Sequence, residues 1–208
     1  MTTPRIYCSG PLFCAEEIGG MSAIAQQLEQ AGFHTFLPHR DGLEPYVMRL
    51  GNTPLPGPLS GIRTRIDHAI FALDVYELIE RCDAVVCNLN GRVPDEGMIV
   101  EAALAYAAGK PLVLFKDDVR APFGGFDNAM LTSLVKGRIV GTLTEIPAAV
   151  RAELAGKKKS AVDLSADLVE AVRQGRNISR ALESLPRRLG KQQWDESVVR
   201  QVIEAGLD

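Results

Sequence analysis

The 208-residue sequence predicts an α/β protein with an open, doubly wound sheet of about five mainly parallel strands. Two observations support this fold class. Short apolar runs alternate with segments of helical periodicity up to about residue 150, which is the order of elements in a parallel sheet. The clearest run, DAVVCNLNG at 83–91, is apolar until Asn-Gly ends it, as is typical of strands covered on both faces. We therefore expect helices on both faces of the sheet.

The individual elements can be placed along the chain because glycine and proline mark most of their ends. The expected elements are a strand at 5–9, a helix at about 15–31, a strand at 34–38, a helix at 62–81, a strand at 83–91, a helix at about 96–108, and strands at 110–118 and 137–146. Gly32 ends the first helix as a C′ residue does. The stretch 39–61 is rich in glycine and proline, and a loop of that length is usually functional or mobile.

The chain changes character near residue 150. GKKKS at 156–160 is a basic, solvated break, and short amphipathic helices follow it without a chemical motif. We therefore expect one domain at 1–150 and a helical C-terminal extension at 151–208. We expect this extension to form an oligomer contact or to cover an edge of the sheet.

The composition argues against several classes of protein. A net charge of −3 gives no general attraction to nucleic acid or to a membrane surface, and no apolar run approaches a membrane-spanning length. The N-terminus enters a strand without a secretory segment, and the four cysteines form no CxxC pair, so we expect reduced thiols and a cytoplasmic protein. No histidine has a His or Cys partner at ligand spacing, and GxxxxGK[ST] and GxGxxG are absent, so we expect neither a metal nor a cofactor.

Polar residues follow the predicted strands at the ends where ligands bind in such sheets. These ends carry Gly10 to Phe13, Pro38 to Asp41, Asn88 to Asp95, and Asp117 with Asp118. Because the carboxyl ends of parallel strands lie along one edge, the sequence predicts the functional site there.

Glu101 is the most unusual residue near that edge, because it lies in the apolar, small-residue helix of DEGMIVEAALAYAAGKPLV. Its side chain could extend to solvent or pair with a basic side chain. Alternatively, it could be a carboxylate nucleophile, which the positive end of the helix would keep ionised and the small neighbours would leave accessible.

Two further acids have structural and functional interpretations. Asp95 stands where an N-cap residue belongs, and capping does not exclude catalysis. Asp74 lies at the apolar–polar boundary of the second helix, where a surface acid is also common. Two carboxylates facing one bond are the usual arrangement for cleaving a glycosidic linkage, and no GxSxG elbow offers different chemistry.

Several motifs occur in order between about residues 4 and 142. They are Tyr7–Phe13 (YCSGPLF), Asp74, Cys82–Gly91 (CDAVVCNLNG), Asp95–Pro111 (DEGMIVEAALAYAAGKP), Asp118–Arg120 (DVR) and Asn128–Met130 (NAM). In this order and spacing they resemble the nucleoside 2-deoxyribosyltransferase family. The resemblance implies a flavodoxin-like fold and cleavage of the N-glycosidic bond of 2′-deoxyribonucleosides, followed by transfer of the sugar to another nucleobase.

The resemblance also implies roles for individual residues. Glu101 matches the nucleophile of the DxGxxxE motif, which would form a covalent deoxyribosyl ester, and Tyr7 matches the tyrosine that orients it. Asp74 and Asp95 match acids that contact the base, so either could handle the proton of the leaving group. The remaining expected substrate contacts are Gly10, Phe13, His39, Arg40, Asn128 and Met130.

Asn128 and Met130 match a segment that reaches the sugar of a neighbouring subunit, which implies at least a homodimer. Met98 departs from the family, which usually has Thr or Ser there, so a hydroxyl near the carboxylate is lost.

Hydrolysis of deoxynucleosides or of nucleoside 5′-monophosphates is an alternative that uses the same nucleophile. In that case Ser9, Arg40 and Arg120 would be candidate phosphate contacts. A binding protein without turnover is a third possibility. The sequence leaves transfer and hydrolysis open.

Overall fold

The computed structural model describes residues 2–47, 63–91, 93–120, 126–156, 163–185 and 196–207. The chain divides into two compact units. The first, here called the sheet unit, contains Met1–Leu37 and Leu78–Asp163. The second, here called the helical unit, contains Pro38–Glu77 and Leu164–Asp208. The domain boundary near residue 150 stays a prediction.

The described residues of the sheet unit form a sheet of five strands, all parallel, in the order β2-β1-β3-β4-β5. The strands are β1 (Arg5–Ser9), β2 (His34–Phe36), β3 (Ala84–Asn88), β4 (Leu112–Phe115) and β5 (Ile139–Val140). This is the flavodoxin-like order, whose switch point lies between β1 and β3. The predicted fold class is therefore confirmed.

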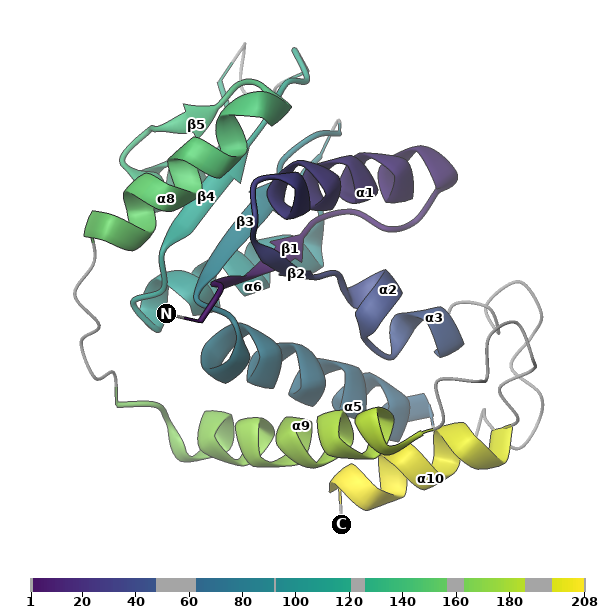
Figure 1. The fold of residues 1–208 in the computed structure, drawn as a ribbon. Coiled ribbons are helices and arrows are strands. Elements are labelled where there is room, and N and C mark those ends of the chain that lie inside the picture. Colours follow the sequence, from purple (N-terminus) through teal and green to yellow (C-terminus); the bar gives the residue numbers. More distant parts are fainter. Residues whose placement is uncertain are drawn as a thin grey trace. The chain divides into compact units, whose positions relative to one another are not determined.

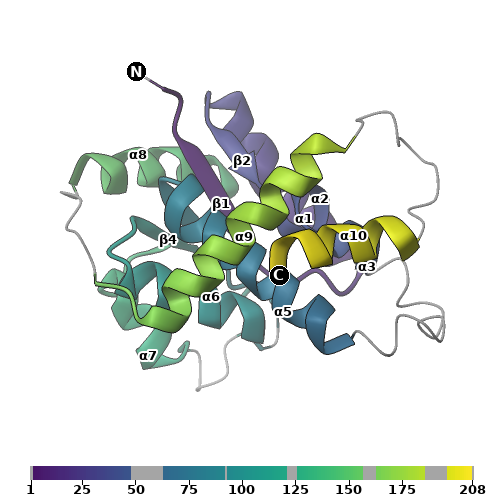
Figure 2. The same cartoon turned by 90° about the horizontal axis from the view of Figure 1, so that it is seen from below.

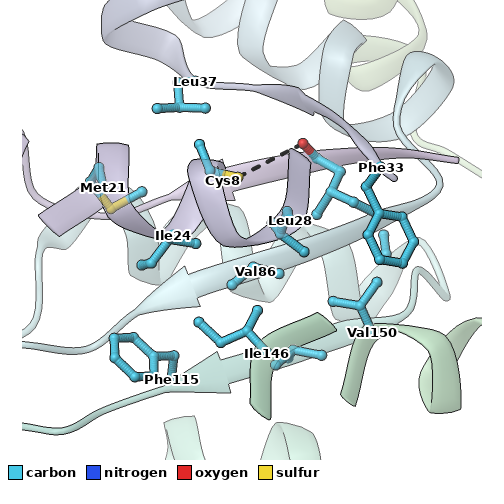
Figure 3. Close-up of a cluster of buried hydrophobic side chains, with 14 residues drawn as sticks. Cys8, Met21, Ile24, Leu28, Phe33, Leu37, Val86, Phe115, Ile146 and Val150 are labelled. Atoms are coloured by element: carbon cyan, nitrogen blue, oxygen red, sulfur yellow. Dashed lines mark hydrogen bonds between the residues drawn. The ribbon is translucent and has the colours of Figure 1, made fainter. Parts of the chain in front are cut away.

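Helices cover both faces of this sheet, as expected (Figure 1). On one face, α1 (Ala15–Gln30) packs over β1 and α8 (Ile146–Gly156) over β3 and β4, and the shared core includes Ile6 and Cys8. Figure 3 shows that core, in which the Cys8 thiol donates to the Ile6 carbonyl oxygen at 4.0 Å. On the other face, α6 (Glu96–Ala107) packs over Tyr7. The alternation of side chains along β1 thus assigns residues 7 and 9 to the α6 face.

The start of α1 is fixed by a capping box in the loop that follows β1. The Glu17 carboxylate accepts from the backbone amides of Phe13 and Cys14, at 2.8 and 3.1 Å. After the helix, Gly32 has a φ of +88°, a conformation that glycine adopts without strain. Both ends of α1 are therefore encoded locally, and the predicted helix end at Gly32 is confirmed.

The helical unit contains α2 (Pro38–Asp41), α3 (Glu44–Val47), α5 (Arg63–Tyr76), α9 (Ala166–Ser184) and α10 (Glu196–Leu207). Within it, α9 packs against both α5 and α10 (Figure 2). Gly175 allows α9 to approach α5 closely, because a Cβ atom there would lie 2.0 Å from the Ala72 carbonyl oxygen. Ser165 caps α9 by accepting from the Leu168 amide at 3.3 Å.

Several predicted elements differ from the structure. The strands predicted at 83–91 and 110–118 cover only Ala84–Asn88 and Leu112–Phe115. The second strand ends at Phe36, because Pro38 begins α2. The last strand covers only Ile139–Val140, and the chain then turns through a 3-10 helix at Leu143–Glu145 into α8. The second helix changes to a π-helical turn at Glu77–Arg81. Most of the predicted loop at 39–61 lies outside the described residues, and its first part forms α2 and α3.

No helix within the described ranges is both long enough and apolar enough to cross a membrane.

Candidate active site

The Glu101 carboxylate is held by two hydroxyl groups from β1. The Tyr7 hydroxyl donates to Glu101 Oε1 at 2.6 Å, and the Ser9 hydroxyl donates to Glu101 Oε2. Tyr7 and Ser9 are fully buried, whereas Glu101 is half-buried and keeps a route to solvent. Hydrogen bonds donated to a carboxylate stabilise its ionised form. The site therefore contains an oriented carboxylate near the carboxyl end of β1.

The position of Glu101 follows from the way α6 packs on the sheet. Met98, Ala102 and Ala105 are buried against the sheet, so Glu101 lies at the edge of the buried face. Two of these three residues are alanines, whose small side chains let the helix approach β1 closely enough for the contacts with Tyr7 and Ser9. Glu101 also lies in the second turn of α6, near the positive end of the helix dipole.

A second contact, made by the ring itself, also fixes Tyr7. It stacks on the Phe36 ring of β2, with ring centroids 5.4 Å apart and an interplanar angle of 29°. Because stacking and burial leave the ring few alternative orientations, the hydroxyl is held in place before any ligand binds.

Cys87 of β3 also belongs to this site. Burial raises the pKa of its thiol well above the usual value, and the negative charge of Glu101 raises it further. Cys87 is therefore a neutral thiol beside the carboxylate and its Ser9 donor.

Asp95 forms the N-cap of α6. Its Oδ2 atom accepts from the Met98 amide at 2.7 Å, so the structural interpretation from the sequence is confirmed. The residue is half-buried, and no described residue donates to its Oδ1 atom. Met98 itself is fully buried in the core on the α6 face, so its side chain serves packing.

A cavity of about 600 Å³ lies at the carboxyl ends of β1, β3 and β4, beside the first turns of α1. It is lined by Pro11, Cys14, Glu16, Glu17, Gly20, Asn88, Asn90, Gly91, Asp117, Asp118 and Arg120. The polar edge that the sequence predicted is therefore present in the sheet unit. Gly10 lies behind it, where a Cβ atom would be 2.5 Å from Met21 Sδ and 2.8 Å from Asn88 Cβ.

Asn90 joins the two loops that form the edge of this cavity. Its side-chain amide donates to Asp117 Oδ1 at 2.5 Å, and its oxygen accepts from the amides of Asp117 and Asp118 at 3.0 and 3.2 Å. The Asp118 carboxylate in turn accepts from the Gly91 amide at 3.1 Å. These bonds join Asn90 and Gly91, which follow β3, to Asp117 and Asp118, which follow β4.

Arg120 is paired with Asp118 in the same loop. The side-chain hydrogen bonds from Arg120 hold the pKa of the Asp118 carboxyl well below its usual range, and the Arg120 pKa is raised by the same contact. This guanidinium is therefore committed to Asp118 in the structure.

The other predicted residues of the sheet unit lie on its surface. Phe13 and Met130 are 78% and 82% exposed. Asn128 caps the short helix α7 (Ala129–Thr132) by accepting from the Met130 amide at 2.9 Å. The expected role of Asn128 and Met130 in a neighbouring subunit stays a prediction.

Asp74, His39 and Arg40 belong to the helical unit. Asp74 is half-buried on α5 and forms a side-chain hydrogen bond with Glu44, whose pKa is raised chiefly by burial. Burial and the neighbouring Arg40 lower the pKa of His39, while Arg40 pairs with Asp41 at 2.9 Å. Their predicted contacts with a base remain predictions.

The sequence interpretation missed how Ser9 is used, since it suggested only a phosphate contact. A signal was present in the sequence, because Ser9 lies two residues after Tyr7 on one strand and must face the same side. For Cys87 the sequence predicts only a reduced thiol.

Among the described residues, no group of three or more His, Cys, Asp or Glu side chains is placed to hold a metal ion.

The chain is similar in sequence to known proteins. The sequence model for "Nucleoside 2-deoxyribosyltransferase" matches residues 6–130. A curated adenine phosphoribosyltransferase from Butyrivibrio fibrisolvens is 34% identical over 82 residues, which are 38% of this chain and 46% of that protein. The chain thus spans less than half the length of this curated relative.

Two solved structures are also similar. A conserved protein from Enterococcus faecalis V583 has a TM-score of 0.51 at 19% identity, covering 73% of this chain and 99% of that chain, which indicates the same fold. A 2-deoxyribosyltransferase from Bacillus psychrosaccharolyticus has a TM-score of 0.49 at 22% identity, covering 77% and 99%. Since the family match covers more than half of the sequence, the chain belongs to the nucleoside 2-deoxyribosyltransferase family.

Proposed function

We propose that this protein transfers 2-deoxyribose between nucleobases, with 2′-deoxyribonucleosides as donors and Glu101 as the nucleophile. The observation that carries the proposal is the Glu101 carboxylate, held through both oxygens by Tyr7 and Ser9 on a residue that is only half-buried. An oriented, accessible carboxylate near the carboxyl ends of parallel strands is suited to attack on an anomeric carbon. Family membership supports the same class of reaction.

In the first half-reaction, a Glu101 oxygen attacks C1′ of the deoxynucleoside as the C1′–N bond breaks, through an oxocarbenium-like transition state. The electron pair of that bond leaves with the base, which takes up a proton, and a deoxyribosyl ester forms on Glu101. In the second, a nitrogen of another base attacks C1′ and loses its proton, and the carboxylate leaves. Two displacements on one carbon give net retention of configuration.

Asp95 is the carboxylate of the sheet unit that we assign to this proton. Its Oδ2 atom caps α6, and its Oδ1 atom is left for a proton or a base. Asp74 of the helical unit is the second acid that the family resemblance assigns to base contact. We further propose that Asn128 and Met130 complete the site of a neighbouring copy, for which the exposure of Met130 leaves room.

The test is to incubate the protein with one deoxynucleoside and a different free base, and to separate the products by chromatography. The expected product is the exchanged deoxynucleoside. Glu101→Gln should lower the exchange rate by roughly a thousandfold or more, because the nucleophile is lost. The matched control is Glu96→Gln, which neutralises an exposed carboxylate on the same helix and should leave the rate nearly unchanged. Equal rates in both variants would remove Glu101 from the mechanism.

The same experiment separates transfer from hydrolysis. Free deoxyribose that accumulates even at a high concentration of acceptor base would identify water as the acceptor. The structure gives the monophosphate alternative no separate support in the sheet unit, because Ser9 is bonded to Glu101 and Arg120 to Asp118.

A further inference from the structure

The strand register places Cys87 beside Ser9. Ser9 of β1 pairs with Cys87 of β3, and both side chains are fully buried on the sheet face that α6 covers. Paired residues of neighbouring parallel strands point to the same face, so the Cys87 thiol lies next to the Ser9 hydroxyl, which donates to Glu101 Oε2. Polar groups of β3 and β1 therefore lead to the carboxylate.

The direction of these hydrogen bonds follows from the number of protons available. A serine hydroxyl has one proton and two lone pairs, and the Ser9 proton is committed to Glu101. Toward Cys87 the hydroxyl can therefore only accept, so a hydrogen bond between the two groups must be donated by the thiol. Burial and the charge of Glu101 both raise the pKa of Cys87, which keeps the required proton on sulfur.

We propose that Cys87 and Ser9 are positioning residues for Glu101: the thiol orients the Ser9 hydroxyl, and the hydroxyl holds Oε2. Together with the Tyr7 bond to Oε1, this arrangement removes the rotation of the carboxylate about its last bond. A nucleophile that is already oriented need not be ordered in each turnover, which lowers the barrier to attack. The effect on rate rests on the proposed function, whereas the effect on the ionisation of Glu101 does not.

A matched pair of cysteines allows a sharp test. Cys87 and Cys8 are both fully buried strand residues, but Cys8 lies on the opposite face of the sheet, in the core under α1. Cys87→Ala and Cys8→Ala remove the same atom from equally buried positions. A general effect of core packing should appear in both variants, and an effect on Glu101 only in the first.

The first measurement needs no substrate. The carboxyl carbon of Glu101 is followed by NMR across a pH titration in the wild type and in Ser9→Ala, Cys87→Ala and Cys8→Ala. Ser9→Ala should move the titration to higher pH, because it removes a bond donated to the ionised form. Cys87→Ala should move it in the same direction by less. Cys8→Ala should leave it at the wild-type position.

The second measurement is steady-state base exchange. Ser9→Ala should lower kcat by about tenfold or more with KM within about twofold, because the lost bond is made to a charged group. Ser9→Thr keeps a hydroxyl on a strand that accepts β-branched residues, and should recover most of kcat. The double variant Ser9→Ala/Cys87→Ala should be no slower than Ser9→Ala, because Cys87 acts through Ser9.

The outcomes separate the two proposals. If the titration of Glu101 shifts as expected in a protein that exchanges no bases, the positioning role of Ser9 and Cys87 is supported and the proposed function is overturned. If the wild type is active but Ser9→Ala changes neither the titration of Glu101 nor kcat, only the positioning role is overturned. If Cys87→Ala and Cys8→Ala behave identically, Cys87 has no part in positioning Glu101. If Ser9→Ala fails to fold, Ser9→Thr and the cysteine pair carry the test.

Discussion

Replacing Tyr7 by Phe removes one hydroxyl and keeps the ring. The 2.6 Å bond to Glu101 Oε1 is lost, while the stacking on Phe36 and the Ser9 bond to Oε2 remain. A hydrogen bond to a charged group contributes about 1.5–3 kcal/mol, which corresponds to about 10- to 150-fold in rate. Because Glu101 is half-exposed and water can replace part of the lost bond, we expect kcat to fall by about 10- to 30-fold.

The assay is the initial rate of base exchange over a range of deoxynucleoside concentrations, with thermal unfolding as a check on the fold. Tyr106→Phe is the matched control, because it removes a hydroxyl from an exposed tyrosine of α6 and should leave kcat unchanged. A folded Tyr7→Phe protein with kcat within about twofold of the wild type would refute the reasoning, since a bond made to the nucleophile would then contribute almost nothing.

Three further predictions concern other parts of the chain. Gly175→Ala should destabilise the helical unit by about 3 kcal/mol or more, because its methyl group would overlap the Ala72 carbonyl; unchanged amide-exchange protection of α5 and α9 would contradict this. Asn90→Ala should cost about 1–2 kcal/mol, because it removes the bonds that join two loops, and an unchanged urea midpoint would argue against such a clamp. Burial raises the pKa of Glu44, so the folded state keeps its proton longer and the wild type loses stability as pH rises above the ordinary carboxyl range. The Tm of Glu44→Gln relative to the wild type should therefore increase over that pH range, and a constant difference would exclude this role of Glu44.

The parallel sheet could be predicted because its central strands are short, apolar and bounded by glycine. The end of β5 was missed although the sequence contained a signal for it. Thr142 and Glu145 form the capping box of the next helical turn, so the chain leaves the sheet there despite its apolar residues. The four-residue helix-start motif at 142–145 ends the strand earlier than the apolar residues of this run predict.

Part of the site could also be predicted. Glu101 is unusual as an acid in an apolar helix, the family resemblance implies that Tyr7 orients it, and their contact is present in the structure. The role of Cys87 depends on the register between β1 and β3, which is a long-range property that no local pattern contains. The grouping of 38–77 with 164–208 is of the same kind, because it depends on contacts such as that of Gly175 with Ala72.

Because Asp95 caps α6 through only one of its carboxylate oxygens, the two oxygens of Asp95 are not equivalent. Oδ2 accepts from the Met98 amide, and protonation there would weaken the start of the helix that carries Glu101. In the mechanism that we propose, the proton exchanged with the base therefore belongs on Oδ1. The leaving base must then face Oδ1, on the side of Asp95 away from the helix. Keeping α6 intact therefore fixes the side of Asp95 on which the nucleobase binds.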